Sequence, residues 1–136
     1  MVSFRDSYSQ DPHLVENGAW VEFDDGVRVQ IRSFQSKESK DVRKRLMLPH
    51  AAFERRGKSL PDDVSEQILI RQMAEAIIVS WEGVTDAEGN VLECNLENKL
   101  AILTDKSLTP FRDDIAMAAA ERNTFKRAVV ENTVKY

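Results

Sequence analysis

Residues 19–31, with the sequence AWVEFDDGVRVQI, decide the fold class because they predict a β-hairpin. Two runs of β-prone residues flank the turn-forming sequence DDG at residues 24–26. Gly26 can adopt the left-handed backbone conformation that closes such a loop. We therefore expect a β-hairpin over residues 19–32.

The register of this hairpin follows from which side chains share a face, because a slip of one residue turns every side chain over. A two-residue loop would pair Phe23 with Arg28 and mix the faces. A three-residue loop instead pairs Phe23 with Val27, Val21 with Val29 and Ala19 with Ile31, and sets Glu22 opposite Arg28. The second register is the prediction. Its apolar face must be covered by helices or by another chain, because an isolated hairpin is marginal in water.

Helices are predicted to follow the hairpin. A charged helix is expected at residues 36–48, where Pro49 ends it, and a short helical turn at residues 51–56. The strongest helical pattern covers residues 61–81, with a wide apolar stripe at helical spacing and Gly83 at the expected C-cap.

The last third of the chain contains further turn and cap signals. Residues 84–92 predict a small hairpin or loop. Asn95 is expected to cap a helix that ends near Thr104, and Thr109-Pro110 to start a final helix that carries Phe125 and Val129.

These elements predict an α+β fold that is mainly α-helical, with an N-terminal β-hairpin followed by a small helical domain. The length of 136 residues suits one domain. Residues 1–17 are polar and lack periodicity, so we expect a flexible N-terminal arm there. The single domain is then expected to cover residues 18–136, with its helical part at residues 36–133.

Composition narrows the function classes. No apolar run approaches the roughly 20 residues of a membrane span, and residues 1–10 lack the pattern of a signal peptide. Cys94 is the only cysteine, so no internal disulfide can form, and we expect it to be a small apolar filler.

The charges are unevenly distributed along the chain, whose net charge is -4. Residues 37–58 carry eight basic and three acidic side chains, a net +5, whereas residues 62–97 carry nine acidic and one basic, a net -8. Two interpretations of these charge runs remain open. They are either the solvated faces of helices, or patches of opposite charge that steer association with neighbouring copies or with a partner. Few aromatics accompany the basic run, so general nucleic-acid binding is not expected.

A search for catalytic patterns favours a binding protein over an enzyme. The common motifs for nucleotide phosphates, zinc proteases, serine hydrolases and calcium loops do not occur. Neither His13 nor His50 has a partner set by the sequence. Asp86, Glu88 and Asn90 alternate as metal ligands might, but a turn explains them better. No cofactor, metal site or catalytic residue is predicted.

Residues 76–86 (AIIVSWEGVTD), 89–92 (GNVL) and 95–100 (NLENKL) resemble the tail assembly chaperones of long-tailed bacteriophages. These proteins commonly have a hydrophobic helix that leads into a W-x-G-V-x-D-x-x-G turn, then an E-N element and a helix started by proline, with an aromatic residue near its end. Trp81, Gly83, Asp86 and Gly89 match the turn, and Pro110 and Phe125 match the last two features. The resemblance covers roughly residues 60–128.

The resemblance implies a protein that binds the tape measure protein, keeps it soluble and recruits tail tube subunits in the host cytoplasm. It also implies absence from the mature virion and, in many members, a minor longer product made by ribosomal frameshifting. We place the client surface on Phe125, Val129 and Val130, which are expected to be exposed, or on an uncovered hairpin face. Association of this protein with further copies of itself is a possibility that the sequence leaves open.

Two other functions remain open. A structural virion component, such as a tail connector or tail-completion protein, could use the hairpin to pair with neighbours in a ring. A regulatory nucleic-acid binder could use the basic helix.

Overall fold

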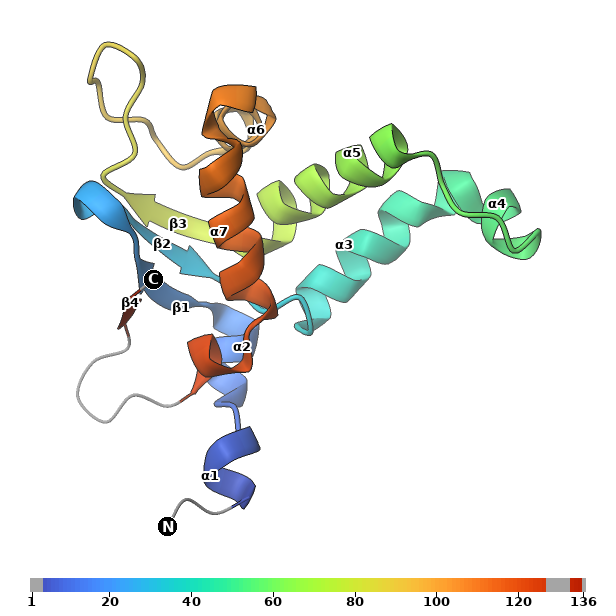
Figure 1. Cartoon of the computed structure of the whole chain (residues 1–136), viewed down its shortest axis with the longest axis horizontal. Coiled ribbons are helices and arrows are strands. Elements are labelled where there is room, and N and C mark those ends of the chain that lie inside the picture. The colour runs from blue at the N-terminus through green and yellow to red at the C-terminus, as the bar shows by residue number, and fades with distance from the viewer. Residues whose placement is uncertain (1–3, 127–132, 136) are drawn as a thin grey trace.

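A four-stranded sheet lies at the centre of the protein in this computed structural model, which describes residues 4–126 and 133–135 (Figure 1). The strand order is β3-β2-β1-β4. β1 pairs with β2 and β2 with β3 in antiparallel fashion, while β4 lies parallel to β1. The strands are β1 (Ala19–Glu22), β2 (Arg28–Ile31), β3 (Ile78–Glu82) and β4 (Thr133–Lys135). With the helices described below, the predicted α+β, mainly α-helical fold is confirmed.

The hairpin has the predicted register. Val21 pairs with Val29 and Ala19 with Ile31, and Glu22 lies opposite Arg28. Gly26 has the expected positive φ of 77°, and Asp25 shares the left-handed conformation with a φ of 59°. The inner side chains of this face are fully buried, and α7 crosses it (Figure 1). The expectation that this face is an uncovered client surface is therefore wrong.

The N-terminal segment is more ordered than the sequence suggests. It forms α1 (Phe4–Tyr8) and α2 (Pro12–Asn17). Asp11 caps α2 by accepting a hydrogen bond from the His13 backbone, and Leu14 is buried in the core. The prediction of a flexible arm over residues 1–17 is wrong for α2, because two adjacent apolar side chains, Leu14 and Val15, on a six-residue helix give no periodic signal.

Three helices form an arm that projects to one side of the sheet (Figure 1). They are α3 (Lys37–Met47), α4 (Ala51–Arg55) and α5 (Asp62–Gln72), with a 3-10 turn at Leu48–His50 between α3 and α4. α3 and α5 pack side by side, and α4 forms the tip. The helices predicted at residues 36–48 and 51–56 are confirmed.

The predicted helix over residues 61–81 is only partly correct. After α5 the chain makes a π-helical turn at Met73–Ile77 and then enters β3. Residues 77–79 are β-branched, and β3 completes the hydrogen bonds on the free edge of β2, so tertiary pairing overrides the helical period. The wide apolar stripe instead reflects burial of the π-helical turn on nearly all sides. Gly83 consequently follows a strand and caps no helix.

The last two helices begin as predicted, and α6 also ends as predicted, but α7 ends early. α6 (Leu96–Thr104) is capped by Asn95, whose side chain accepts a hydrogen bond from Asn98 N at 2.8 Å. α7 (Thr109–Ala120) stops before Phe125, which lies in a 3-10 turn at Arg122–Phe125. The prediction of a helical part reaching residue 133 is also wrong, since Thr133 begins β4.

Candidate functional site

The motif that carries the phage resemblance builds the turn between β3 and α6. Trp81 is buried, and its indole nitrogen donates a hydrogen bond to the Leu92 carbonyl at 2.9 Å. Asp86 Oδ1 accepts hydrogen bonds at 2.9 Å from the backbone nitrogens of Glu88 and Asn90. These bonds lower the pKa of the Asp86 carboxyl group, with the bond from Asn90 the largest cause. The prediction of a turn in place of a metal loop agrees with this geometry.

The two motif glycines have different surroundings. Gly83 has a φ of 80°, and a Cβ atom there would lie 2.6 Å from the carbonyl oxygen of Gly26. Gly89 has a φ of 86°, and a Cβ atom there would contact nothing within 4 Å. Gly83 thus allows the motif to pack directly against the hairpin loop, whereas Gly89 only closes its own turn.

The same turn forms one wall of an apolar trough, whose other wall comes from α6 and the start of α7. The trough consists of two adjoining hollows of about 270 Å³ and 480 Å³ that share Thr85, Ile102 and Leu108. Phe111 and Val27 line the first hollow, and Leu92 and Ala101 line the second. Phe111 is held by an edge-to-face contact with Phe23, with ring centroids 5.7 Å apart.

Polar groups also line the trough. Asp86, Asn98, Asp105 and Ser107 contribute to the second hollow. The Asp105 carboxylate accepts hydrogen bonds from the hydroxyl and backbone nitrogen of Ser107, which lower its pKa. A mainly apolar lining with a few polar groups suits a groove that binds an amphipathic helix.

Sequence reasoning did not find the trough, although a signal was present. The predicted α6 stripe uses Leu96, Leu100 and Leu103, whereas Ile102 falls off this stripe and faces the trough. An apolar residue off the core-facing stripe of a short helix indicates a second apolar contact.

The partner-binding prediction fails at Phe125. Its side chain is 0% exposed and belongs to the core, where the chain after α7 turns back beneath the sheet. Its carbonyl also accepts a hydrogen bond from Asp11 N at 2.8 Å. A residue so enclosed offers no docking surface. Val129 and Val130 lie outside the described residues.

A half-buried cation holds the π-helical turn. Lys99 Nζ donates hydrogen bonds to the carbonyl oxygens of Ile78 at 2.7 Å and Ala74 at 3.2 Å. Burial lowers the pKa of Lys99 and raises the pKa of the nearby Cys94 thiol. Cys94 packs against the core, as expected of a filler. Lys99 thus donates to two backbone carbonyls where the π-helical turn passes into β3.

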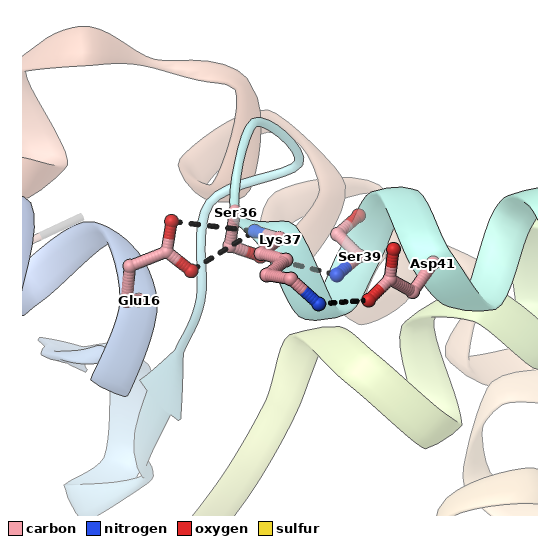
Figure 2. Close-up of polar contacts among 5 residues, drawn as sticks. All are labelled: Glu16, Ser36, Lys37, Ser39 and Asp41. Carbon is pink, nitrogen blue, oxygen red and sulfur yellow. Dashed lines mark hydrogen bonds and ion pairs between the residues drawn. The ribbon is translucent and has the colours of Figure 1, made fainter.

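The base of the projecting arm is anchored to α2 (Figure 2). The Glu16 carboxylate accepts hydrogen bonds from the Lys37 backbone nitrogen at 2.9 and 3.3 Å, at the positive end of α3. Ser36 caps the same helix by accepting a bond from Ser39 N at 3.2 Å, and the Lys37 ammonium pairs with Asp41 at 2.7 Å. These bonds fix the direction of the arm at its root.

Polar contacts also join α3 to α5. Buried Gln72 donates hydrogen bonds to the Ser39 hydroxyl at 2.9 Å and to its carbonyl at 3.2 Å. Glu75 bridges Arg45 and Arg71. Burial acts to raise the pKa of Glu75, but the hydrogen bonds and charges of the two arginines outweigh it and the pKa is lowered. These contacts join the two helices of the arm along their shared side.

The outer face of the arm combines basic and apolar side chains. A hollow of about 400 Å³ between α3 and α4 is lined by Lys40, Arg43, Lys44, Met47, Leu48, Ala51 and Glu54. Leu48 is 66% exposed. The three cations make no ion pair with any other described residue. We call this the basic arm face.

The described part of the chain has neither a cluster of metal-ligating side chains nor a helix suited to cross a membrane. There, no group of three or more His, Cys, Asp or Glu side chains is arranged to hold a metal ion. None of the helices within residues 4–126 combines the length and apolarity needed to cross a membrane. His13 bonds with Asn17, and His50 lies at the end of the turn before α4.

Comparison with known proteins gives one result. Residues 34–136, about three quarters of the chain, match the family described as YdaY prophage protein. The chain belongs to this family. The match covers the arm, the motif turn and the helices that form the trough, and it establishes a phage-related protein. No curated protein and no solved structure matches the chain.

Proposed function

We propose that this phage protein is a tail assembly chaperone that binds an apolar helical client in the trough between residues 83–92 and α6–α7. One observation carries the proposal: the turn that resembles those of tail assembly chaperones contributes Gly83, Val84 and Asp86 to the lining of the trough. Membership of a prophage protein family supports the phage setting.

The client class follows from the chemistry of the trough. An amphipathic helix buries residues at positions i, i+3 or i+4 and i+7 in a groove of this kind, while its polar face remains hydrated. The tape measure protein, which is long, helical and apolar, is the client implied by the resemblance. The chaperone would cover such a stripe in the host cytoplasm, promote assembly with tail tube subunits, and leave before the virion is complete. This activity is binding and requires no catalysis.

The structural-component alternative has less support. It needs the hairpin to pair with neighbouring copies, yet β1 already lies between β2 and β4, and β2 lies between β1 and β3. Neither strand of the hairpin has a free edge for another chain. Mass spectrometry of purified particles separates the two functions, since a chaperone is absent from virions.

Co-expression with the tape measure protein of the same prophage tests the proposal. The chain should increase the soluble fraction of the client. Ala101→Glu, at an exposed trough position, should remove this effect, because a carboxylate cannot be buried against an apolar helix without a large penalty. Met117→Glu, at an exposed position of α7 outside the trough, is the matched control. The proposal is wrong if the client is equally insoluble with and without the chain.

A further inference from the structure

The basic arm face has a counterpart at the other end of the molecule. Residues 82–97 contain five carboxylates and no Lys or Arg. Glu82 pairs with Arg28, and Asp86 bonds within its turn. Glu88, Glu93 and Glu97 are exposed and form no ion pair with a basic side chain of the described residues, and the side chain of Glu88 interacts with Asp86. We call these three side chains, with their neighbours Val91 and Leu96, the acidic end.

Apolar side chains accompany the charges on both surfaces. Val91 is 81% exposed and Leu96 is 40% exposed at the acidic end. Leu48 and Met47 line the hollow of the basic arm face. Each surface therefore offers an apolar contact together with a net charge. The charge is positive at the basic arm face, where three cations outnumber Glu54, and negative at the acidic end.

The two surfaces cannot meet within one molecule. In Figure 1 the tip of the arm lies at one end of the long axis, the tip of the loop between β3 and α6 lies toward the other end, and α6 lies between them. The arm is also fixed at its root by Glu16 and Gln72. A second copy of the chain is the partner that is certain to carry the matching surface.

We propose that copies of this protein associate head to tail, with the acidic end of one copy seated on the basic arm face of the next. Such a contact joins two different surfaces, so it propagates into a ring or an open chain and does not stop at a symmetric dimer. Charge attraction steers the encounter, and the exposed apolar side chains of the two surfaces are buried at the contact. The acidic end adjoins the trough, because its neighbours Ala87, Leu92 and Asn98 line the second hollow. The association uses other side chains and does not depend on the proposed chaperone function.

A charge-swap experiment on the full chain tests this contact. One variant, Lys40→Glu/Arg43→Glu/Lys44→Glu, has two acidic surfaces, and the other, Glu88→Lys/Glu93→Lys/Glu97→Lys, has two basic ones. In sedimentation at about 0.01 M salt, where charges act over roughly 30 Å, the wild type should exceed its 15.5 kDa monomer mass. Either variant alone should associate at least about a hundredfold more weakly, because like charges then face each other.

An equimolar mixture of the two variants should restore association, because each basic surface again meets an acidic one. Raising the salt to about 1 M, where the screening length is roughly 3 Å, should dissociate wild type and mixture alike. Asp113→Lys/Asp114→Lys, on an exposed part of α7 outside both surfaces, should associate like the wild type. Circular dichroism checks that every variant is folded.

Two results overturn the proposal: a wild type that stays monomeric at low salt, or a mixture that associates no better than its components. If the wild type is monomeric but the basic arm face binds duplex DNA in a salt-dependent way, the unpaired cations serve nucleic acid and not a second copy.

Discussion

Replacement of Gly83 by alanine tests the close packing between the motif turn and the hairpin. The added Cβ atom would lie 2.6 Å from the carbonyl oxygen of Gly26 and 3.3 Å from the Cα atom of Val27. Both contacts are with backbone, which cannot rotate away as a flexible side chain would. Gly83 also has a φ of 80°, a conformation that alanine adopts only with strain.

The magnitude follows from two contributions. A non-glycine residue in the left-handed region costs about 1–2 kcal/mol. Forcing a methyl group into a packed contact adds about 1–3 kcal/mol. We therefore expect Gly83→Ala to lower the free energy of unfolding by about 2–5 kcal/mol, and the melting temperature by about 4 °C for each kcal/mol in a domain of this size.

Gly89→Ala is the matched control, because its φ of 86° gives the same backbone strain while its Cβ atom meets nothing within 4 Å. It should lose only about 1–2 kcal/mol. Urea unfolding followed by circular dichroism measures both variants. If Gly83→Ala is no less stable than Gly89→Ala, the close approach to Gly26 does not constrain the fold and the reasoning is refuted.

Three further predictions concern the arm. Gln72→Leu should lower the free energy of unfolding by about 1–3 kcal/mol, because it leaves the buried Ser39 hydroxyl without its hydrogen-bond donor. In a double-mutant cycle with Ser39→Ala, the effects of the two substitutions on the free energy of unfolding should not add. Glu75 has a lowered pKa in the folded protein, so its stabilisation is present above about pH 4.5 and is lost as the pH falls through the folded pKa. Glu75→Gln should therefore reduce the dependence of the free energy of unfolding on pH in this acidic range. An unchanged dependence there would contradict the prediction. Glu16→Ala should speed hydrogen exchange at the Lys37 amide, whereas equal rates would show that the carboxylate does not hold the root of the arm.

Local signals were sufficient where a short segment specifies its own geometry. The hairpin register followed from period-two alternation and from Gly26, both of which lie within thirteen residues. Asn95 and Pro110 marked the starts of α6 and α7, because caps depend on the first turn of a helix alone. The turn around Asp86 likewise closes through bonds among five consecutive residues.

The candidate surfaces were only partly visible in the sequence. The basic and acidic stretches were evident as charge runs, but the structure places the start of the acidic stretch, α5, beside α3 in the arm and its end in the loop after β3 and in α6. The trough joins residues from the hairpin, the motif turn and two helices, so no single window of sequence contains it. The placement of Phe125 on an exposed helix was wrong because α7 ends at Ala120 and the chain then turns inward.

By itself, the sequence determined the elements whose hydrogen bonds are local: the hairpin, the capped helices and the tight turn. Only the tertiary structure decided that residues 78–82 form a strand, because their apolar, β-branched composition is compatible with a helix until the free edge of β2 supplies backbone partners. The parallel pairing of β4 with β1 is likewise tertiary, since more than a hundred residues separate the two strands. Local propensity sets what a segment can form, and long-range pairing and burial select among those possibilities.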